Sequence, residues 1–169
     1  WMAGRKEEEV EDALEMISVA PTFKDEGWLR TAFEVRKKYP QDIYRSLGIP
    51  TWFYGHEPAT PFATDIAKYF MNSVREDILL SAAKGGIIYS PGSAGTIQEV
   101  FQDAAQNHYQ SFGYPSPMVF LGEDYYSREI PLYPLLKDLV ARGVYKSLLL
   151  DITDDPDEAI ACIMSFTEQ

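Results

Sequence analysis

The sequence predicts an α/β fold, in which a parallel sheet is covered by helices on both faces. Short apolar segments at 87–89, 118–121 and 147–152 alternate with longer segments of helical periodicity, and this alternation is typical of parallel sheets. A length of 169 residues argues for one domain. A composition of 46% hydrophobic and 24% charged residues is that of an ordinary globular chain.

The first third of the chain is predicted to be mainly helical. Residues 1–18 carry carboxylates in their early turns and one apolar stripe, which suits a helix. No cap residue precedes Trp1, so we expect this helix to start upstream of that residue. A second helix is expected over 28–39, and 42–48 is expected to be a connector. The β-prone run 50–54 predicts a short strand.

Prolines and glycines divide the remainder of the chain. Two prolines within 56–61 predict a loop. Apolar residues that repeat every four positions predict a helix over 65–84, closed by Gly85 and Gly86. The further elements expected are a strand at 87–89, a helix ending near Tyr109, a strand at 118–121, a helix at 132–141, a strand at 147–152 and a helix at 157–166.

The charge and the residue inventory exclude several classes of function. The net charge is −11, and so acidic a surface repels phosphate backbones, which argues against binding of a nucleic-acid polymer. The sequence has no run of about 18 apolar residues, so we expect no membrane span. Cys162 is the only cysteine, and His56 and His108 are too few for a histidine-based metal cluster. We therefore expect a cytoplasmic protein that uses no metal and no cofactor.

The stretch from Gly86 to Thr96 runs from a predicted strand through a glycine-containing loop into a helix. Gly92 and Gly95 leave room for a ligand against the backbone. The first N–H groups of a helix have no partner within it, and with the helix dipole they form an anion site, most naturally for a phosphate. The spacing matches neither a Walker loop nor the dinucleotide fingerprint. The alternative is a tight turn that needs its glycines for geometry alone.

Thr96 and Glu99 admit two interpretations. They fit a capping box, in which each side chain satisfies a backbone N–H group at the start of the helix. In the functional interpretation, the Glu99 carboxylate lies in the first helical turn beside the anion site, within reach of a ribose. Helical spacing places Asp103 and Gln106 on the face of Glu99 and places His108 on the opposite face.

Residues 91–99, which read PGSAGTIQE, resemble the PGGxGTxxE signature of the LOG family. A second signature of that family is an Arg-Lys pair further upstream. Arg75 matches its arginine, whereas Glu76 replaces its lysine. The string 69–77, YFMNSVRED, is most similar to the larger bacterial members, which are nucleotide 5′-monophosphate nucleosidases. The resemblance covers roughly residues 50–140.

The resemblance implies a function. LOG proteins are Rossmann-like phosphoribohydrolases, long described as lysine decarboxylases, that split a nucleoside 5′-monophosphate into free base and ribose 5-phosphate. It implies that Glu99 stabilises the oxocarbenium-like transition state and orients water, and that Arg75 orients Glu99 or helps the departing base. The residues implied to bind the phosphate and the rest of the nucleotide are Gly92, Ser93, Ala94, Gly95, Thr96, Glu57 and Glu76.

The resemblance also shapes the expected architecture. We expect one LOG-like Rossmann domain, 1–169, with a helical segment at 1–49 and a nucleotide-binding core at 50–169. The family's earlier glycine-rich stretch is absent, so the chain is expected to be the C-terminal portion of an incomplete domain. Relatives are dimers or larger, which implies a homo-oligomer. Two alternatives stay open: a non-catalytic nucleotide-binding or cofactor-carrier module of the same fold, and a structural domain with an aromatic oligomer interface.

Overall fold

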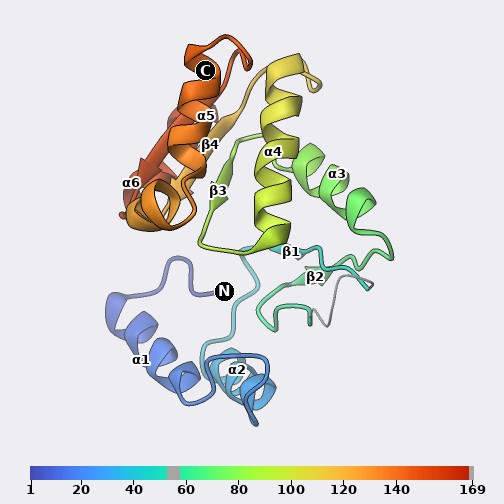
Figure 1. Ribbon diagram of the computed structural model, residues 1–169. Coiled ribbons are helices and arrows are strands. Elements are labelled where there is room, and N and C mark those ends of the chain that lie inside the picture. Colours follow the sequence, from blue (N-terminus) through green and yellow to red (C-terminus); the bar gives the residue numbers. More distant parts are fainter. Residues whose placement is uncertain (53–57, 168–169) are drawn as a thin grey trace. The chain divides into compact units, whose positions relative to one another are not determined.

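The computed structural model describes residues 1–52 and 58–167, and it divides the chain into two compact units. The first unit is Trp1–Arg75 and the second is Glu76–Gln169, so the boundary falls inside one helix. Figure 1 shows the elements of both units, coloured along the sequence. The predicted single domain, with its internal boundary between residues 49 and 50, stays a prediction.

The described part of the first unit combines two helices with a short parallel sheet. Its elements are α1 (Glu7–Ser18), α2 (Trp28–Lys38), β1 (Leu47–Gly48), β2 (Asp65–Ile66) and the beginning of α3 (Asn72–Ala82). α1 packs against α2 (Figure 1), and Ala13, Val35 and Tyr39 are buried in this contact. Beside them, Lys38 Nζ and the Tyr39 hydroxyl both donate to the Asp12 carboxylate at 2.7 Å, which ties the two helices together.

Three sequence predictions for this unit are wrong. The stretch 42–48 is not a connector throughout, because its last two residues form β1 and pair with β2. α1 begins at Glu7 and not upstream of Trp1, because the Glu9 carboxylate accepts the Lys6 N–H at 3.2 Å and so closes the start of the helix. The predicted helix over 65–84 begins only at α3, since β2 pairs in parallel with β1. A spacing of four residues is also a multiple of the strand period of two, so it fits one face of a strand equally well.

The predicted strand over 50–54 is only partly described. Thr51 forms an isolated parallel bridge with Tyr69, which continues the pairing of β1 with β2. Phe53 and Tyr54 lie outside the described residues.

The second unit carries the predicted alternation of strands and helices. After the end of α3 its described elements are β3 (Ile87–Tyr89), α4 (Ala94–Tyr109), β4 (Pro117–Leu121), the π-helix η1 (Tyr125–Glu129), α5 (Leu132–Ala141), β5 (Leu149–Thr153) and α6 (Pro156–Thr167). The three strands form a parallel sheet in the order β3-β4-β5. This confirms a mixed helix and strand fold with small parallel sheets flanked by helices. In the part of the chain that the structure describes, no helix is long and apolar enough to cross a membrane.

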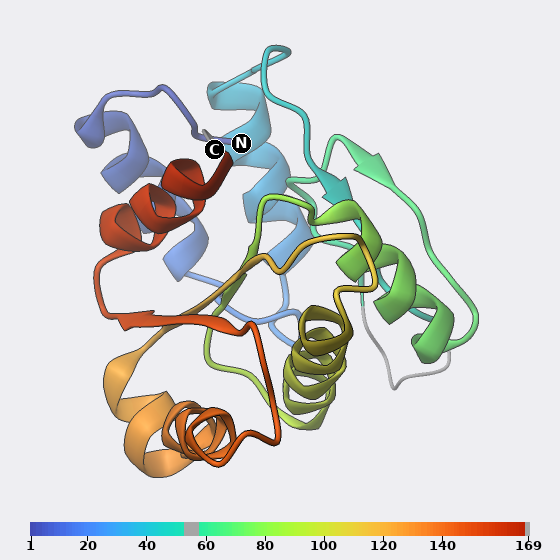
Figure 2. The ribbon, with the colours of Figure 1, turned by 90° about the horizontal axis from the view of Figure 1, so that it is seen from above.

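The two faces of the sheet in the second unit are covered by different helices (Figure 2). α4 and α5 lie on one side, where Tyr89, Met118 and Phe120 pack in the main core, and α6 lies on the other side against β4. Met118, Val119 and Phe120 have no exposed surface at all. β4 is therefore the centre of the unit, and its carboxyl end and that of β3 open at the same edge of the sheet.

Candidate functional site

The loop after β3 leads directly into the positive end of α4. Ser93 is the N-cap residue, and its carbonyl oxygen accepts the Ile97 N–H at 3.1 Å. The Ser93 side chain makes no cap hydrogen bond. By helical geometry, the N–H groups of residues 93–96 are the ones without an acceptor inside the helix. They form a cluster of donors at the end of α4 where the helix dipole favours negative charge.

Gly92 is required by packing within the loop. The Thr96 side-chain oxygen occupies the position where a Cβ atom of residue 92 would lie, so no larger residue fits this backbone. Ser93 stands where the LOG signature has a second glycine. Its φ is −114°, an ordinary value for a residue with a side chain, so glycine is not needed there.

Two tyrosine hydroxyls donate hydrogen bonds to carbonyl groups of this loop. Both belong to η1, the π-helix that follows β4. The Tyr126 hydroxyl donates to the Ser90 carbonyl oxygen at 2.6 Å, and the Tyr125 hydroxyl donates to the Gly92 carbonyl oxygen. Burial raises the pKa of Tyr126 to about 12, so its hydroxyl remains protonated and stays a donor. Single turns of π-helix are rare and occur frequently at functional sites.

Glu99 is not part of a capping box, so that interpretation is wrong. α4 begins at Ala94, which makes Thr96 the third helical residue and Glu99 the sixth, too far along to cap the start. The Glu99 side chain is half-buried. Burial raises the pKa of the Tyr89 and Tyr126 hydroxyls, and the negative charge of Glu99 raises both further.

Asp103 lies one turn beyond Glu99, in a buried polar network. Its carboxylate accepts the Tyr89 hydroxyl at 2.7 Å and the Asn107 side-chain amide at 3.0 Å. The Asn107 side-chain oxygen in turn accepts the Ser116 N–H at 2.7 Å. Burial raises the pKa of Asp103 to about 6, although the Tyr89 hydrogen bond opposes that rise. The network fixes the Tyr89 ring at the carboxyl end of β3.

A row of glutamines on α4 faces α3. Gln98 Nε2 donates to the Glu76 carboxylate at 2.6 Å, and Gln102 and Gln106 both donate to Asp77. Glu76 is fully buried, so this contact ties the two helices. Gln106 is seven residues beyond Glu99, a rotation of about 700°, so it lies on the Glu99 face as the spacing predicted, and its side chain extends from there to Asp77.

Arg75 and His108 each hydrogen-bond to a described neighbour. Arg75 belongs to the first unit, is buried, and donates through Nη2 and Nε to the Asn72 side-chain oxygen at 2.8 and 3.2 Å. Glu57 lies outside the described residues. His108 Nδ1 accepts the Lys146 N–H at 2.9 Å, which directs this ring toward the segment before β5 and away from Glu99, as the spacing predicted.

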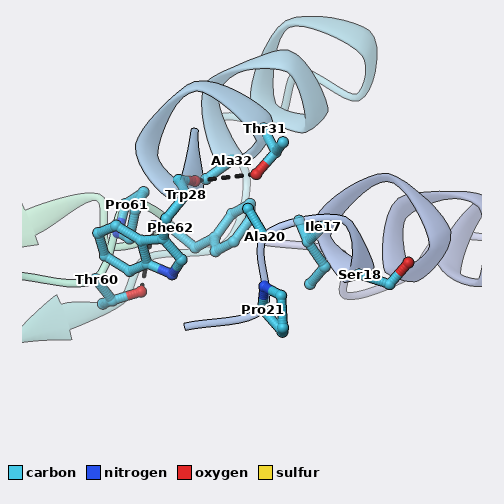
Figure 3. A pocket seen from close by; sticks show the side chains of 10 residues that line it. All are labelled: Ile17, Ser18, Ala20, Pro21, Trp28, Thr31, Ala32, Thr60, Pro61 and Phe62. Carbon is cyan, nitrogen blue, oxygen red and sulfur yellow. Dashed lines mark hydrogen bonds between the residues drawn. The ribbon is translucent and has the colours of Figure 1, made fainter. Parts of the chain in front are cut away.

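The first unit contains an apolar cavity of about 260 Å³ (Figure 3). It lies between the end of α1, the start of α2 and the turn at 60–62, and Trp28 and Phe62 form much of its wall. None of the described residues that line it has an ionisable side chain. The cavity is therefore unsuited to acid–base chemistry.

Comparisons with protein-family models and with curated proteins find no match to the chain. The site thus rests on geometry. Among the described residues, no three His, Cys, Asp or Glu side chains are grouped so that they could hold a metal ion.

Sequence reasoning brought residues 92–96 and Glu99 together correctly on one loop and helix, but it missed Tyr125, Tyr126 and Tyr89. The available signal was that Tyr125 and Tyr126 follow the carboxyl end of a parallel strand, the edge where ligand sites in such sheets are built.

Proposed function

We propose that the chain binds a nucleoside 5′-monophosphate and hydrolyses its N-glycosidic bond, on a Rossmann-like fold of the LOG type. One observation carries the proposal: the backbone donors 93–96 and Glu99 lie within the first two turns of α4, which follows the carboxyl end of β3 beside that of β4. Ligands of open parallel sheets bind at this edge.

The 5′-phosphate is proposed to accept hydrogen bonds from the N–H groups of residues 93–96. A site made of backbone donors and a helix dipole binds a small anion without any lysine or arginine. Such a site suits a chain with a net charge of −11, because its donors are local and fixed. The same net charge disfavours long polyanions, so the substrate class is a mononucleotide.

Glu99 is proposed to act on the sugar. It lies about three residues beyond Thr96, and with a rise of about 1.5 Å per residue this places it on the scale of one ribose from the phosphate donors. A carboxylate there stabilises positive charge at the anomeric carbon and orients the attacking water. Arg75 enters the proposal through the family resemblance alone.

A second candidate is a nucleotide-binding module that does not turn over its ligand. The observation that favours it is Glu76, which stands where the family has a lysine and is tied to Gln98 inside the protein. The site then lacks that positive charge. Homo-oligomer formation, which the resemblance implies, belongs to both candidates and is measured by sedimentation.

The deciding experiment incubates the chain with AMP, GMP, CMP and UMP and measures released base by chromatography. Glu99→Gln is expected to lower base release by about 100-fold or more, because the transition-state charge loses its counter-charge. Nucleotide affinity is expected to change less than about threefold, since the phosphate donors are untouched.

The matched control is Asp157→Asn, which removes one negative charge at the start of α6, on the opposite face of the sheet. It is expected to leave base release unchanged. Nucleotide binding without base release by the unaltered chain would favour the module instead. A chain that neither binds nor cleaves any of the four nucleotides would refute both candidates.

A further inference from the structure

The two tyrosine hydroxyls of η1 make the same kind of bond to the loop but at different peptide groups. Tyr126 holds the carbonyl of Ser90, and Tyr125 holds the carbonyl of Gly92. The two rings meet edge to face, with centroids 5.0 Å apart, so each braces the other. The difference between them lies in the residue that follows each carbonyl.

The geometry of the peptide group decides what each bond does. In a trans peptide the C=O and the next N–H point in opposite directions, and no described peptide bond is cis. A Gly92 carbonyl held toward Tyr125 therefore turns the Ser93 N–H away from Tyr125. The Ser90 carbonyl precedes Pro91, which has no N–H to turn. Of the two hydrogen bonds, only the one from Tyr125 therefore orients a backbone N–H group, that of Ser93.

We propose that Tyr125 is a positioning residue of the phosphate site: by holding the Gly92 carbonyl, it directs the Ser93 N–H toward the bound phosphate. This inference rests on the proposed function and deepens it. Ser93 is the N-cap residue and has non-helical dihedral angles, so the direction of its N–H is the one least constrained by helical geometry. The remaining donors, residues 94–96, are already aligned by α4 itself.

The experiment compares Tyr125→Phe with Tyr126→Phe in the full chain. Each variant loses one hydroxyl and keeps its ring, and each breaks one bond to a loop carbonyl. Tyr125→Phe is expected to weaken AMP binding about tenfold, the effect of one misdirected hydrogen bond to a charged group. Tyr126→Phe is expected to change it less than about threefold. Calorimetric titration gives the affinities, and thermal unfolding of both variants reports any loss of structure.

A second measurement follows the backbone amides directly by ¹H–¹⁵N NMR, with inorganic phosphate as the probe. In the unaltered chain and in Tyr126→Phe, the Ser93 amide is expected to shift on titration together with those of residues 94–96. In Tyr125→Phe, the Ser93 shift is expected to be lost while the other three persist. A merely structural role of Tyr125 would weaken all four together.

The outcomes separate this inference from the proposed function. Equal affinities of the two variants for AMP, or a Ser93 amide that does not respond to phosphate in the unaltered chain while residues 94–96 do, would overturn the role of Tyr125 and leave the phosphate site standing. An unaltered chain in which neither AMP nor phosphate shifts any of these amides would overturn both. An unresponsive Ser93 amide in the unaltered chain would overturn the role of Tyr125 even if Tyr125→Phe does not fold.

Discussion

Among single residues, Asp103 has the clearest consequence for pH. It is buried and its pKa is raised from 3.8 to about 6. Between these pH values the folded chain holds a proton on this carboxyl that the unfolded chain has lost. The free energy of unfolding therefore falls as the pH rises from about 4 to about 6, and the contribution is present in full only below that range.

Asp103→Asn is expected to remove this contribution. Between about pH 4 and pH 7, the free energy of unfolding of the unaltered chain should fall by on the order of 3 kcal/mol more than that of the variant. Urea unfolding of both proteins at several pH values gives the difference curve, in which the shared contributions of other carboxyls cancel. Asp157→Asn, at an exposed position, serves as the control. A difference curve for Asp103→Asn that is flat through pH 6 would show that Asp103 is ionised throughout.

Among the elements, α4 connects the largest number of features. One row of its side chains reaches β3 through Asp103 and the residue before β4 through Asn107, and another row reaches α3 through its glutamines. Its N-terminus provides the backbone donors of the candidate site. A displacement of α4 would therefore alter the site and the core at the same time.

Gln98→Ala is expected to destabilise the second unit by about 1–3 kcal/mol, because it removes a hydrogen bond to a buried carboxylate. Gln102→Ala breaks a comparable bond to Asp77, an exposed residue where water replaces the lost donor, and is expected to cost clearly less. Urea unfolding measures both. Equal losses would mean that water reaches Glu76 as readily as Asp77.

The sequence predicts the elements of the second unit better than those of the first. The helix over 132–141 is confirmed at both ends, because proline and glycine mark them and the apolar period fits only a helix. β2 was missed because its spacing suits two structures. η1 was missed because a single π-turn leaves no periodic pattern. The Tyr125 contact joins residues 33 positions apart, and no local pattern encodes such a distance.

At the scale of the whole molecule, the charge of the chain opposes the charge of its proposed ligand. The chain has 26 acidic and 15 basic residues, so a nucleotide approaches against a repulsive field before it reaches any local donor. Salt screens this field over about 10 Å at 0.1 M. The overall surface charge therefore governs the rate of association, whereas the backbone donors of the site govern how strongly the bound nucleotide is held.

Raising NaCl from about 20 to about 150 mM is expected to increase the association rate of AMP about twofold, since repulsion between like charges is screened. Stopped-flow measurements with a fluorescent AMP analogue give this rate, and the uncharged nucleoside serves as the control. An association rate that falls with added salt would instead indicate attraction by a basic side chain and would count against a site made of backbone donors.

The attachment of the loop to η1 has a thermodynamic consequence. η1 emerges from β4, the most solvent-excluded strand, and its two hydroxyls hold carbonyls on both sides of Pro91. The loop is therefore preorganised, and binding of an anion would cost little conformational entropy, because no flexible segment has to be ordered. The buried strand β4 thus holds η1 in place, and η1 in turn keeps the loop around Pro91 rigid at the surface.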